Sequence, residues 1–269
     1  MATLTHFGEW ALVTGASAGI GREFARQLAA GGLHVVLAAR REDRLNELAA
    51  EIRSEHGVEA RPIAIDLTTD DAADRLCGSL DGLTIDVLVN NAGFGDAGTF
   101  WTREPGKIAR MVKLNCLTPT MLTRALLPGM VERDRGAVIM VSSVLGMFAC
   151  PYEGLYGATK AFDLSLGESL HHELRDTKVA AITICPSTTD TEFLLAEGMD
   201  PDKVRKLYRH ADSAEKIARI TLKALGRKPT VGPRDYHLLK WVQRVVPRQL
   251  LPRVIGLGMK KQLVQSREG

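Results

Sequence analysis

Short apolar segments alternate with amphipathic segments along most of the chain, and this alternation limits the available folds more than any other feature. Short apolar runs bounded by glycine or polar residues predict buried strands. They lie at Trp10–Thr14, His34–Ala39, Ala60–Asp66, Asp86–Asn90, Ala137–Ser142 and Val179–Cys185. Helices are predicted between them, at Gly21–Ala30, Glu42–Ile52, about 107–133 and about 153–175. Such a pattern predicts right-handed βαβ units and a parallel sheet covered on both faces.

Length and composition agree with one globular domain. The chain has 269 residues, of which 45% are hydrophobic and 25% charged. This composition excludes a disordered, collagen-like or coiled-coil chain. The formal net charge of +3 is too small to indicate nucleic acid as a partner. The sequence therefore predicts a single α/β domain over residues 1–269, with a doubly wound parallel sheet of about seven strands in three α/β/α layers.

The four cysteines lie far apart and form no CxxC pair. This spacing argues against a zinc site or a disulfide framework, and the sequence predicts no metal site. Reduced thiols fit a cytoplasmic protein. The first residues lack the basic and apolar regions of a signal peptide, and no apolar run is long enough to span a membrane.

The segment Thr14–Gly21, TGASAGIG, lies between the first predicted strand and the first predicted helix. Its glycines allow a tight turn and a close approach of the backbone to a pyrophosphate. The helix that follows offers free N–H groups and the positive end of its dipole to phosphates. Glycines in a loop can also serve turn geometry alone, but the strand–loop–helix context predicts a dinucleotide site.

The second predicted strand is followed by Arg40 and Arg41, and no acidic residue stands there. An acidic side chain would accept hydrogen bonds from the ribose 2′-hydroxyl of NAD(H) and repel a 2′-phosphate. Arginine instead pairs with phosphate through charge-assisted hydrogen bonds. The pattern favours NADP(H), recognised by Arg40 more than by Arg41. The alternative is that both arginines simply begin a solvated helix.

Tyr156 and Lys160 are four residues apart and fall on one face of a predicted helix. Tyrosine is a poor acid–base catalyst at neutral pH because its ordinary pKa is about 10, but a neighbouring lysine cation favours the phenolate. Ser143 stands at the end of the fifth predicted strand, where a parallel sheet exposes ligand-binding groups. Its hydroxyl can hold a substrate carbonyl oxygen. Alone, such a Tyr–Lys spacing also occurs where the tyrosine only packs.

Taken together, these segments resemble the short-chain dehydrogenase/reductase (SDR) family, whose members have a Rossmann fold. The resemblance runs from about Trp10 to Thr191 in the family's order and spacing. Its matching pieces are TGASAGIG at 14–21, Asp66 and Leu67, the run Asn90 to Gly93, Asn115, Ser142 and Ser143, and Tyr156 with Lys160.

The resemblance implies a role for each matching residue. Tyr156 would protonate a carbonyl as NADPH delivers hydride, or act as the base in the reverse reaction. Lys160 would bind the nicotinamide ribose and lower the pKa of Tyr156. Ser143 would orient the carbonyl, and Asn115 would hold a water of the proton relay. The complete set of residues predicted at the cofactor is Gly15, Ser17, Ala18, Gly19, Ile20, Gly21, Arg40, Asp66, Leu67, Asn91, Ala92, Gly93, Tyr156, Lys160, Pro186 and Thr191.

One position departs from the family's pattern. The family often has a glycine after the proline that follows the sixth strand, whereas this chain has Ser187 after Pro186. Ser187 affects the expected binding of the nicotinamide carboxamide by the backbone at this position and by Thr191. The predicted fold does not depend on it.

Residues of about 191–212 correspond to the family's variable substrate lid. Its apolar and aromatic residues would make the substrate pocket apolar, or would only pack its helices: Phe193, Leu194, Leu195, Met199 and Tyr208. An apolar pocket points to a lipophilic aldehyde or ketone as the substrate, with an alcohol as its reduced form.

The C-terminal extension of about 233–269 is basic, with eight Lys and Arg residues and two acidic residues. A basic amphipathic helix is typical of a membrane surface element, so peripheral membrane contact is one expectation. The alternative is a helix that docks on its own domain or closes a partner's site. The long helical stretches resemble the family's subunit interfaces, which implies a homodimer or homotetramer.

The sequence thus predicts an NADP(H)-dependent carbonyl reductase or alcohol dehydrogenase. One alternative is an NAD(H)-preferring alcohol dehydrogenase of the same fold. Another is a non-catalytic protein that binds a dinucleotide or a membrane surface. The presence of Asn115, Ser143, Tyr156 and Lys160 argues against a pure binder, which has no need for a proton relay.

Overall fold

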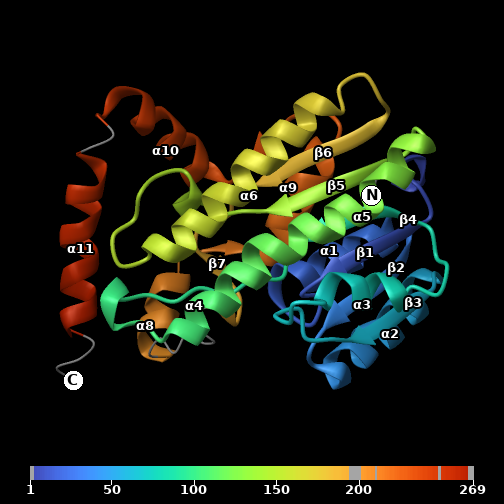
Figure 1. Ribbon diagram of the computed structural model, residues 1–269, viewed down its shortest axis with the longest axis horizontal. Helices are drawn as coiled ribbons and strands as arrows, with labels where there is room; N and C mark the ends of the chain where they lie inside the picture. Colours follow the sequence, from blue (N-terminus) through green and yellow to red (C-terminus); the bar gives the residue numbers. More distant parts are fainter. Residues whose placement is uncertain (1–2, 194–200, 210, 248–249, 266–269) are drawn as a thin grey trace.

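A parallel sheet forms the centre of the protein in its computed structural model, which describes residues 3–193, 201–209, 211–247 and 250–265. Among the described residues, seven strands form this sheet in the order β3-β2-β1-β4-β5-β6-β9, and neighbouring strands are parallel (Figure 1). They are β1 (Trp10–Thr14), β2 (His34–Ala39), β3 (Ala60–Ala64), β4 (Ile85–Asn90), β5 (Gly136–Val141), β6 (Val179–Ile184) and β9 (Thr230–Val231). The predicted Rossmann-type sheet is therefore confirmed.

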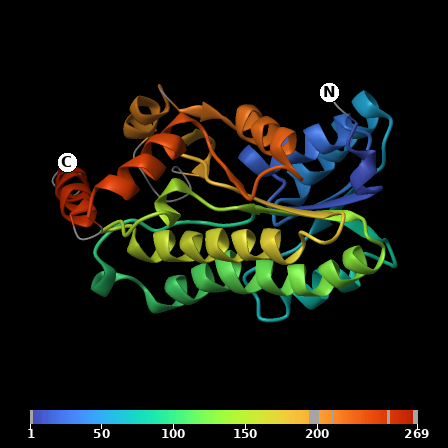
Figure 2. The same ribbon diagram turned by 90° about the horizontal axis from the view of Figure 1, so that it is seen from above.

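Helices cover both faces of this sheet (Figure 2). One layer contains α1 (Gly19–Ala30), α2 (Glu42–His56) and α9 (Ala214–Ala224). The other contains α3 (Ala72–Gly78), α4 (Pro105–Val112), α5 (Thr118–Glu132) and α6 (Gly154–Glu173). Successive strand side chains point to opposite layers, so Val13 and Val89 belong to one core cluster while Leu12 and Leu88 belong to the other.

From β1 the sheet extends in two directions: β2 and β3 lie on one side of it, and β4, β5 and β6 lie on the other. The strand order therefore reverses between β1 and β4. In a doubly wound sheet, ligands bind in the crevice at the carboxyl ends of the strands at this point. Thr14 ends β1 and Asn90 ends β4, so the segments that follow them border the crevice.

The amphipathic helix predicted from Glu42 is present as α2 and extends to His56. Its apolar stripe from Leu45 to Ile52 is buried. Gly57 ends the helix in the left-handed conformation, with φ of +67°, and its N–H donates to the carbonyl oxygen of Arg53.

The helical stretch predicted at about 107–133 is interrupted. A π-helical turn, η3 (Lys113–Leu117), separates α4 from α5. Pro119 lies in the first turn of α5 and has no N–H, so it cannot donate the α-helical hydrogen bond to the carbonyl of Asn115. Such π turns occur frequently at functional sites, and here the turn carries Asn115.

The predicted lid begins and ends at one short parallel pair, in which β7 (Thr189–Asp190) pairs with β8 (Asp212–Ser213). Between them lies α8 (Pro201–Tyr208). The apolar residues Leu194, Leu195 and Met199 of the predicted lid lie outside the described residues. Three short 3₁₀ turns complete the connections, namely η1 (Thr5–Phe7), η2 (Phe100–Thr102) and η4 (Val144–Gly146).

The C-terminal extension forms α10 (Arg234–Val245) and α11 (Leu251–Gln265), which stand at one end of the molecule (Figure 1). Tyr236 is the anchor of α10, because it is buried and packs with Val144 and Cys185. The Gln243 amide also donates to the carbonyl oxygen of Met147. Among the described residues, no helix is both long and apolar enough to cross a membrane.

Candidate active site

The loop between β1 and α1 has the geometry of a phosphate cradle. Gly15 and Gly19 have φ of +69° and +54°, a conformation that side chains rarely adopt. A Cβ at Gly21 would lie 2.4 Å from the carbonyl oxygen of Gly15, so loop and helix meet too closely for a side chain. Ala18 precedes α1, and its methyl group cannot cap the first N–H groups. Uncapped N–H groups beside closely packed backbone fit a dinucleotide pyrophosphate.

Hydrogen bonds join the end of β4 to this loop. The Thr14 hydroxyl donates to the carbonyl oxygen of Val89 at 3.1 Å and accepts from the N–H groups of Asn91 and Ala92 at 3.0 and 3.1 Å. The Asn91 amide donates back to the carbonyl oxygen of Thr14 at 2.9 Å. The structure thus brings the predicted Asn91–Gly93 segment directly beside the glycine loop.

The arginines after β2 occupy different surroundings. Arg41 donates to the Ser17 hydroxyl at 3.2 and 3.1 Å and pairs with Glu192 at 2.7 Å, so it links the glycine loop to the start of the lid. Arg40 is exposed. Hydrogen bonds from Thr68 hold the pKa of Asp66 below its usual value, and the charge of Arg40 acts in the same direction.

A cavity of about 690 Å³ lies between the glycine loop and the lid. Thr191 borders it on the lid side, and its methyl group would lie 2.8 Å from a Cβ at Gly19. The Tyr208 hydroxyl donates to the carbonyl oxygen of Thr191 at 2.6 Å. The basic side chains that line the cavity are Arg22, Arg44, Arg205 and Arg209. Two acidic residues, Asp190 and Glu192, line it as well, so the basic side chains outnumber the acidic ones and the lining favours an anionic ligand.

Tyr156 and Lys160 share a face of α6, as predicted, and both are buried. The Lys160 Nζ lies 6.0 Å from the centre of the Tyr156 ring. It donates to the carbonyl oxygen of Val141 at 2.8 Å and to the Asp163 carboxylate at 2.9 Å. The Ser142 hydroxyl donates to the carbonyl oxygen of Lys160 at 2.6 Å. The end of β5 thus fixes the lysine at both its side chain and its backbone.

Ser143 lies just beyond β5 and caps η4, because its hydroxyl accepts a hydrogen bond from the N–H of Leu145 at 3.1 Å. The turn is tied to the segment after β6, since the Val144 N–H donates to the carbonyl oxygen of Pro186 at 2.9 Å. It also packs tightly on α6, where a Cβ at Gly146 would come within 2.6 Å of the Lys160 backbone. Ser143 therefore stands on a fixed turn beside α6, the helix that carries Tyr156 and Lys160.

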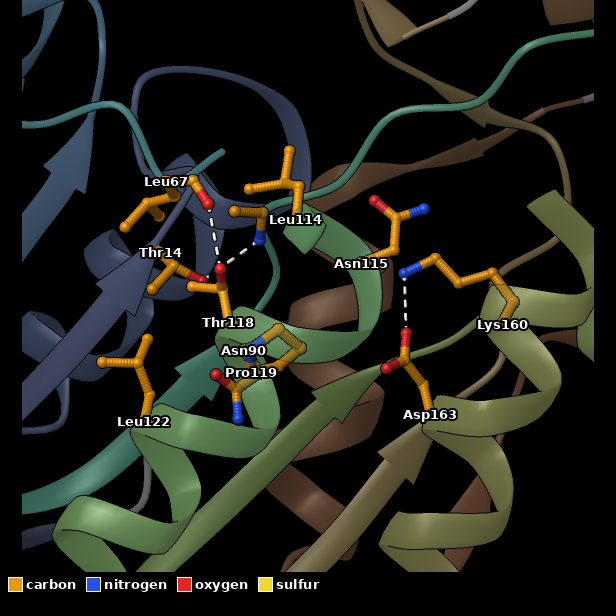
Figure 3. Close-up of a pocket in the computed structure, with 11 residues that line it drawn as sticks. Thr14, Leu67, Asn90, Leu114, Asn115, Thr118, Pro119, Leu122, Lys160 and Asp163 are labelled. Atoms are coloured by element: carbon orange, nitrogen blue, oxygen red, sulfur yellow. Dashed lines mark hydrogen bonds and ion pairs between the residues drawn. The ribbon is translucent and has the colours of Figure 1, made fainter. Parts of the chain in front are cut away.

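The side chain of Asn115 is held by protein groups on both ends. Its amide nitrogen donates to the carbonyl oxygen of Phe94 and to the Thr159 hydroxyl, each at 3.0 Å, and its oxygen accepts from the Phe94 N–H at 3.2 Å. A cavity of about 10 Å³ lies between Asn115, Lys160 and Asp163 (Figure 3). The predicted relay residues are thus neighbours around one small space.

Sequence reasoning did not single out three residues of this region, Glu153, Thr159 and Asp163. Glu153 is only 8% exposed, and burial raises its pKa to about 7, with Asp96 adding to the rise and Arg103 opposing it. The sequence spacing could have indicated two of them. Glu153 lies three residues before Tyr156, and Asp163 lies three residues after Lys160, so each is near its neighbour on a helix. Within the described residues, no group of three or more His, Cys, Asp and Glu side chains is placed to hold a metal ion.

Comparisons with known proteins show the family of this chain. The family model for short chain dehydrogenases matches residues 9–201. Very-long-chain 3-oxoacyl-CoA reductase of Mus musculus is 33% identical over 261 residues, which cover 95% of this chain and 81% of the relative.

Solved structures extend the likeness to three dimensions. A 7β-hydroxysteroid dehydrogenase structure matches with a TM-score of 0.87 and 30% identity, covering 95% of this chain and 100% of that chain. A short-chain dehydrogenase from Sphingobium yanoikuyae in complex with NADPH matches with a TM-score of 0.78 and 29% identity, covering 96% and 95% of the two chains. The family predicted from the motifs is therefore confirmed, and this chain belongs to the short-chain dehydrogenase/reductase family.

Proposed function

We propose that the protein is an NADP(H)-dependent oxidoreductase that reduces the carbonyl of a lipophilic aldehyde or ketone to an alcohol, or catalyses the reverse reaction. The observation that carries this proposal is the buried Tyr156–Lys160 pair on α6, packed against the turn that bears Ser143. The family to which the chain belongs consists of oxidoreductases, which supports an enzyme over a pure binding protein.

The site residues have complementary tasks in the proposed reaction. NADPH bound at the glycine loop supplies the hydride. The Tyr156 hydroxyl gives its proton to the carbonyl oxygen of the substrate, and the Ser143 hydroxyl holds the same oxygen by a hydrogen bond. The Lys160 ammonium stabilises the phenolate that remains. Asn115, on its π turn, keeps a relay water behind the lysine.

Preference for NADP(H) rests on the arginines around the glycine loop. Arg40 and Arg41 follow β2, and four further arginines line the cavity beside the loop. The Sphingobium yanoikuyae relative binds NADPH. A 2′-phosphate placed beside Arg40 would gain charge-assisted hydrogen bonds that the 2′-hydroxyl of NADH cannot make. An NAD(H)-preferring dehydrogenase remains the alternative that a binding assay distinguishes.

Arg40→Ala should weaken NADPH binding by about 10- to 100-fold, because a hydrogen bond to a charged group contributes about 1.5–3 kcal/mol. NADH affinity should change little. Isothermal titration with both cofactors measures the two losses, and Arg53→Ala, an arginine that binds the backbone of Ala60, is the control. Equal losses for NADPH and NADH would show that Arg40 does not recognise the 2′-phosphate.

A lipophilic substrate is supported by the surroundings of the catalytic tyrosine. The Phe193 ring lies 5.6 Å from the Tyr156 ring and gives the lid an aromatic contact at the reacting group. The relatives' names refer to very-long-chain 3-oxoacyl-CoA and to hydroxysteroids, in which the long acyl chain and the steroid ring system are large apolar groups.

The experiment that tests the proposed function follows NADPH oxidation against a panel of carbonyls, with NADH in parallel. The panel extends from small aldehydes through long-chain ketones and 3-oxoacyl thioesters to steroids. Turnover with NADPH that increases with substrate size supports the proposal. Preference for small polar carbonyls would contradict the apolar pocket. NADPH binding without turnover of any carbonyl would favour a non-catalytic dinucleotide-binding protein.

Assembly and location form a second part of the proposal. We propose a homodimer or homotetramer that pairs copies through the outer surface of η3, α5 and α6, where apolar side chains are exposed. They are Leu117, Met121, Val131 and Phe162. We also propose a cytoplasmic location, because the four cysteines are free thiols.

We further propose that α10 and α11 contact an anionic membrane surface. Leu238 and Trp241 are 60% and 61% exposed, so this apolar face does not dock on the described part of the chain. Val245, Val254 and Leu257 continue the exposed apolar surface, and basic residues accompany it. This combination is typical of helices that lie in a membrane interface.

The double variant Leu238→Asp/Trp241→Asp should lose most of its binding to vesicles that contain phosphatidylglycerol. Co-sedimentation with anionic and with neutral vesicles measures the effect. Val112→Asp adds a negative charge at an exposed apolar position on α4, outside the surface proposed for assembly, and should leave binding unchanged. If the wild-type protein stays in the supernatant with anionic vesicles, the membrane contact is wrong.

A further inference from the structure

A buried ion pair lies directly behind the proposed catalytic lysine. Asp163 follows Lys160 by one turn of α6, and its Oδ2 lies 2.9 Å from Lys160 Nζ. The two side chains are almost fully buried, with 4% and 6% of their surfaces exposed. Because Nζ also donates to the Val141 carbonyl oxygen, the ammonium is held between the end of β5 and a carboxylate (Figure 3).

Asp163 also lines the small cavity beside Asn115. In the part of the chain that the structure describes, Asp163 Oδ1 is buried and has no hydrogen-bond partner among protein groups. The cavity, of about 10 Å³, is close to the smallest volume that admits one water. Over the same described residues, Lys160 is the one cation paired with Asp163. The negative charge of Asp163 therefore acts mainly on Lys160.

Other titratable groups near the pair remain neutral. Cys116 approaches from η3 and Cys185 from the end of β6, and burial raises the pKa of their thiols to about 11 and about 12. Within the pair itself, burial raises the pKa of Asp163, and the charge of Lys160 opposes that rise. Tyr156, one turn before Lys160, is a further titratable side chain near the ammonium, with its ring centre 6.0 Å from Nζ.

Stability does not explain why this position carries a carboxylate. A buried ion pair is often no more stabilising than apolar residues of similar volume, because desolvation offsets much of the attraction between the charges. Asp163 lies beside a lysine whose positive charge is needed at the proposed reacting centre. The carboxylate partly offsets the electrostatic influence of that positive charge, and this is the effect from which we argue.

We propose that Asp163 is a positioning residue for proton transfer, whose carboxylate holds Lys160 Nζ at the rear of the site and limits how strongly the ammonium favours the Tyr156 phenolate. The inference rests on the proposed function and adds a residue to its proton-transfer machinery. Asp163 acts through Lys160 and need not touch substrate or cofactor. With a neutral side chain in its place, the uncompensated ammonium should favour the phenolate at lower pH.

The test is an ultraviolet titration of tyrosinate in the full-length protein, which requires no turnover. The step that belongs to Tyr156 is the one lost in Tyr156→Phe. In Asp163→Asn this step should move to lower pH by about one unit, the size expected for a charge several ångströms away at an effective dielectric constant of about 20. Asp163→Ser is also neutral and should give the same direction, so the test does not depend on one variant folding.

Glu168→Gln is the matched control, because it removes a negative charge from the same helix. Glu168 accepts from the Thr230 hydroxyl at 2.6 Å, and among the described residues it forms no hydrogen bond or ion pair with Lys160. Its effect on the Tyr156 step should be much smaller than that of Asp163→Asn. Asp163→Glu, which keeps the charge, should restore the step toward its wild-type position.

The outcomes separate this inference from the proposed function. A Tyr156 step that stays in place or moves to higher pH in the folded neutral variants overturns the role of Asp163, whatever the enzyme assay gives. A downward shift in a protein that reduces no carbonyl supports the role of Asp163 and contradicts the proposed function. If both hold, the alkaline limb of kcat/KM for reduction should move with the tyrosinate step, because reduction needs the protonated phenol.

Discussion

Tyr156→Phe should lower kcat for carbonyl reduction by about 10²- to 10⁴-fold, the range that a positioned general acid contributes. The substitution removes only the hydroxyl. The ring that packs 5.6 Å from Phe193 remains, and so does the glycine loop at the other end of the cofactor site. NADPH affinity should therefore change little. Single-turnover kinetics and cofactor titration measure the two quantities separately.

Tyr236→Phe is the matched control for this prediction. Tyr236 is also a buried tyrosine, and its hydroxyl accepts from Lys240 at 3.2 Å on α10, outside the proposed site. Its loss should leave kcat almost unchanged. If Tyr156→Phe kept most of the wild-type activity, Tyr156 could not be the acid, and the proton would have to come from another group.

The sheet could be predicted from the sequence because its strands are buried on both faces. In β4, β5 and β6 every residue is buried, and such strands are short, continuous apolar runs that are easy to recognise. The glycine loop could be recognised equally well. Gly15 is needed there because its φ is positive, and Gly21 is needed because the packing leaves no room for a side chain. By contrast β9 has two residues, too few for a periodic signal.

Contacts between distant segments could not be predicted in the same way. The sequence around Arg41 does not indicate that its side chain would bond Ser17 and Glu192. These partners come from the glycine loop before α1 and from the start of the lid, which are distant along the chain. The burial of Asp163 is another case. On α6 a carboxylate can face solvent or core, and only the packing of η3 and β5 around the helix decides between them.

The C-terminal extension illustrates the limit of helical periodicity. Leu238 and Trp241 are three residues apart and share one apolar helical face, and docking of the extension on its own domain was one interpretation of the amphipathic pattern. The structure instead buries Tyr236 and leaves both of those residues exposed. An amphipathic pattern predicts that a face will be covered, but it does not identify what covers it.

Glu153→Gln should raise the free energy of unfolding by about 3 kcal/mol near pH 8 and change it little near pH 5. Burial raises the pKa of Glu153 from 4.5 to about 7 in the folded protein. As pH rises between these two values, the unfolded chain releases its proton first. The folded state then holds more protons than the unfolded state, so stability falls with rising pH until the folded carboxyl has also ionised. Glutamine is neutral throughout and avoids this loss.

Urea unfolding of the wild-type protein and Glu153→Gln at the two pH values measures the difference. Glu132→Gln, an exposed position on α5, is the control and should show no comparable pH dependence. An equal difference at both pH values would mean that Arg103 keeps Glu153 ionised in the folded protein, against the effect of burial.

The location of Glu153 connects this stability effect with the proposed chemistry. Its carbonyl oxygen accepts the N–H of Gly157 at 2.8 Å in the first turn of α6, the turn that also carries Tyr156. A charge at Glu153 therefore destabilises the same end of the helix that positions the proposed acid. We expect the population of locally open states near Tyr156, measured by hydrogen exchange at Gly157, to rise between about pH 4.5 and pH 7 in the wild-type protein and to level off above pH 7, with no such rise in Glu153→Gln.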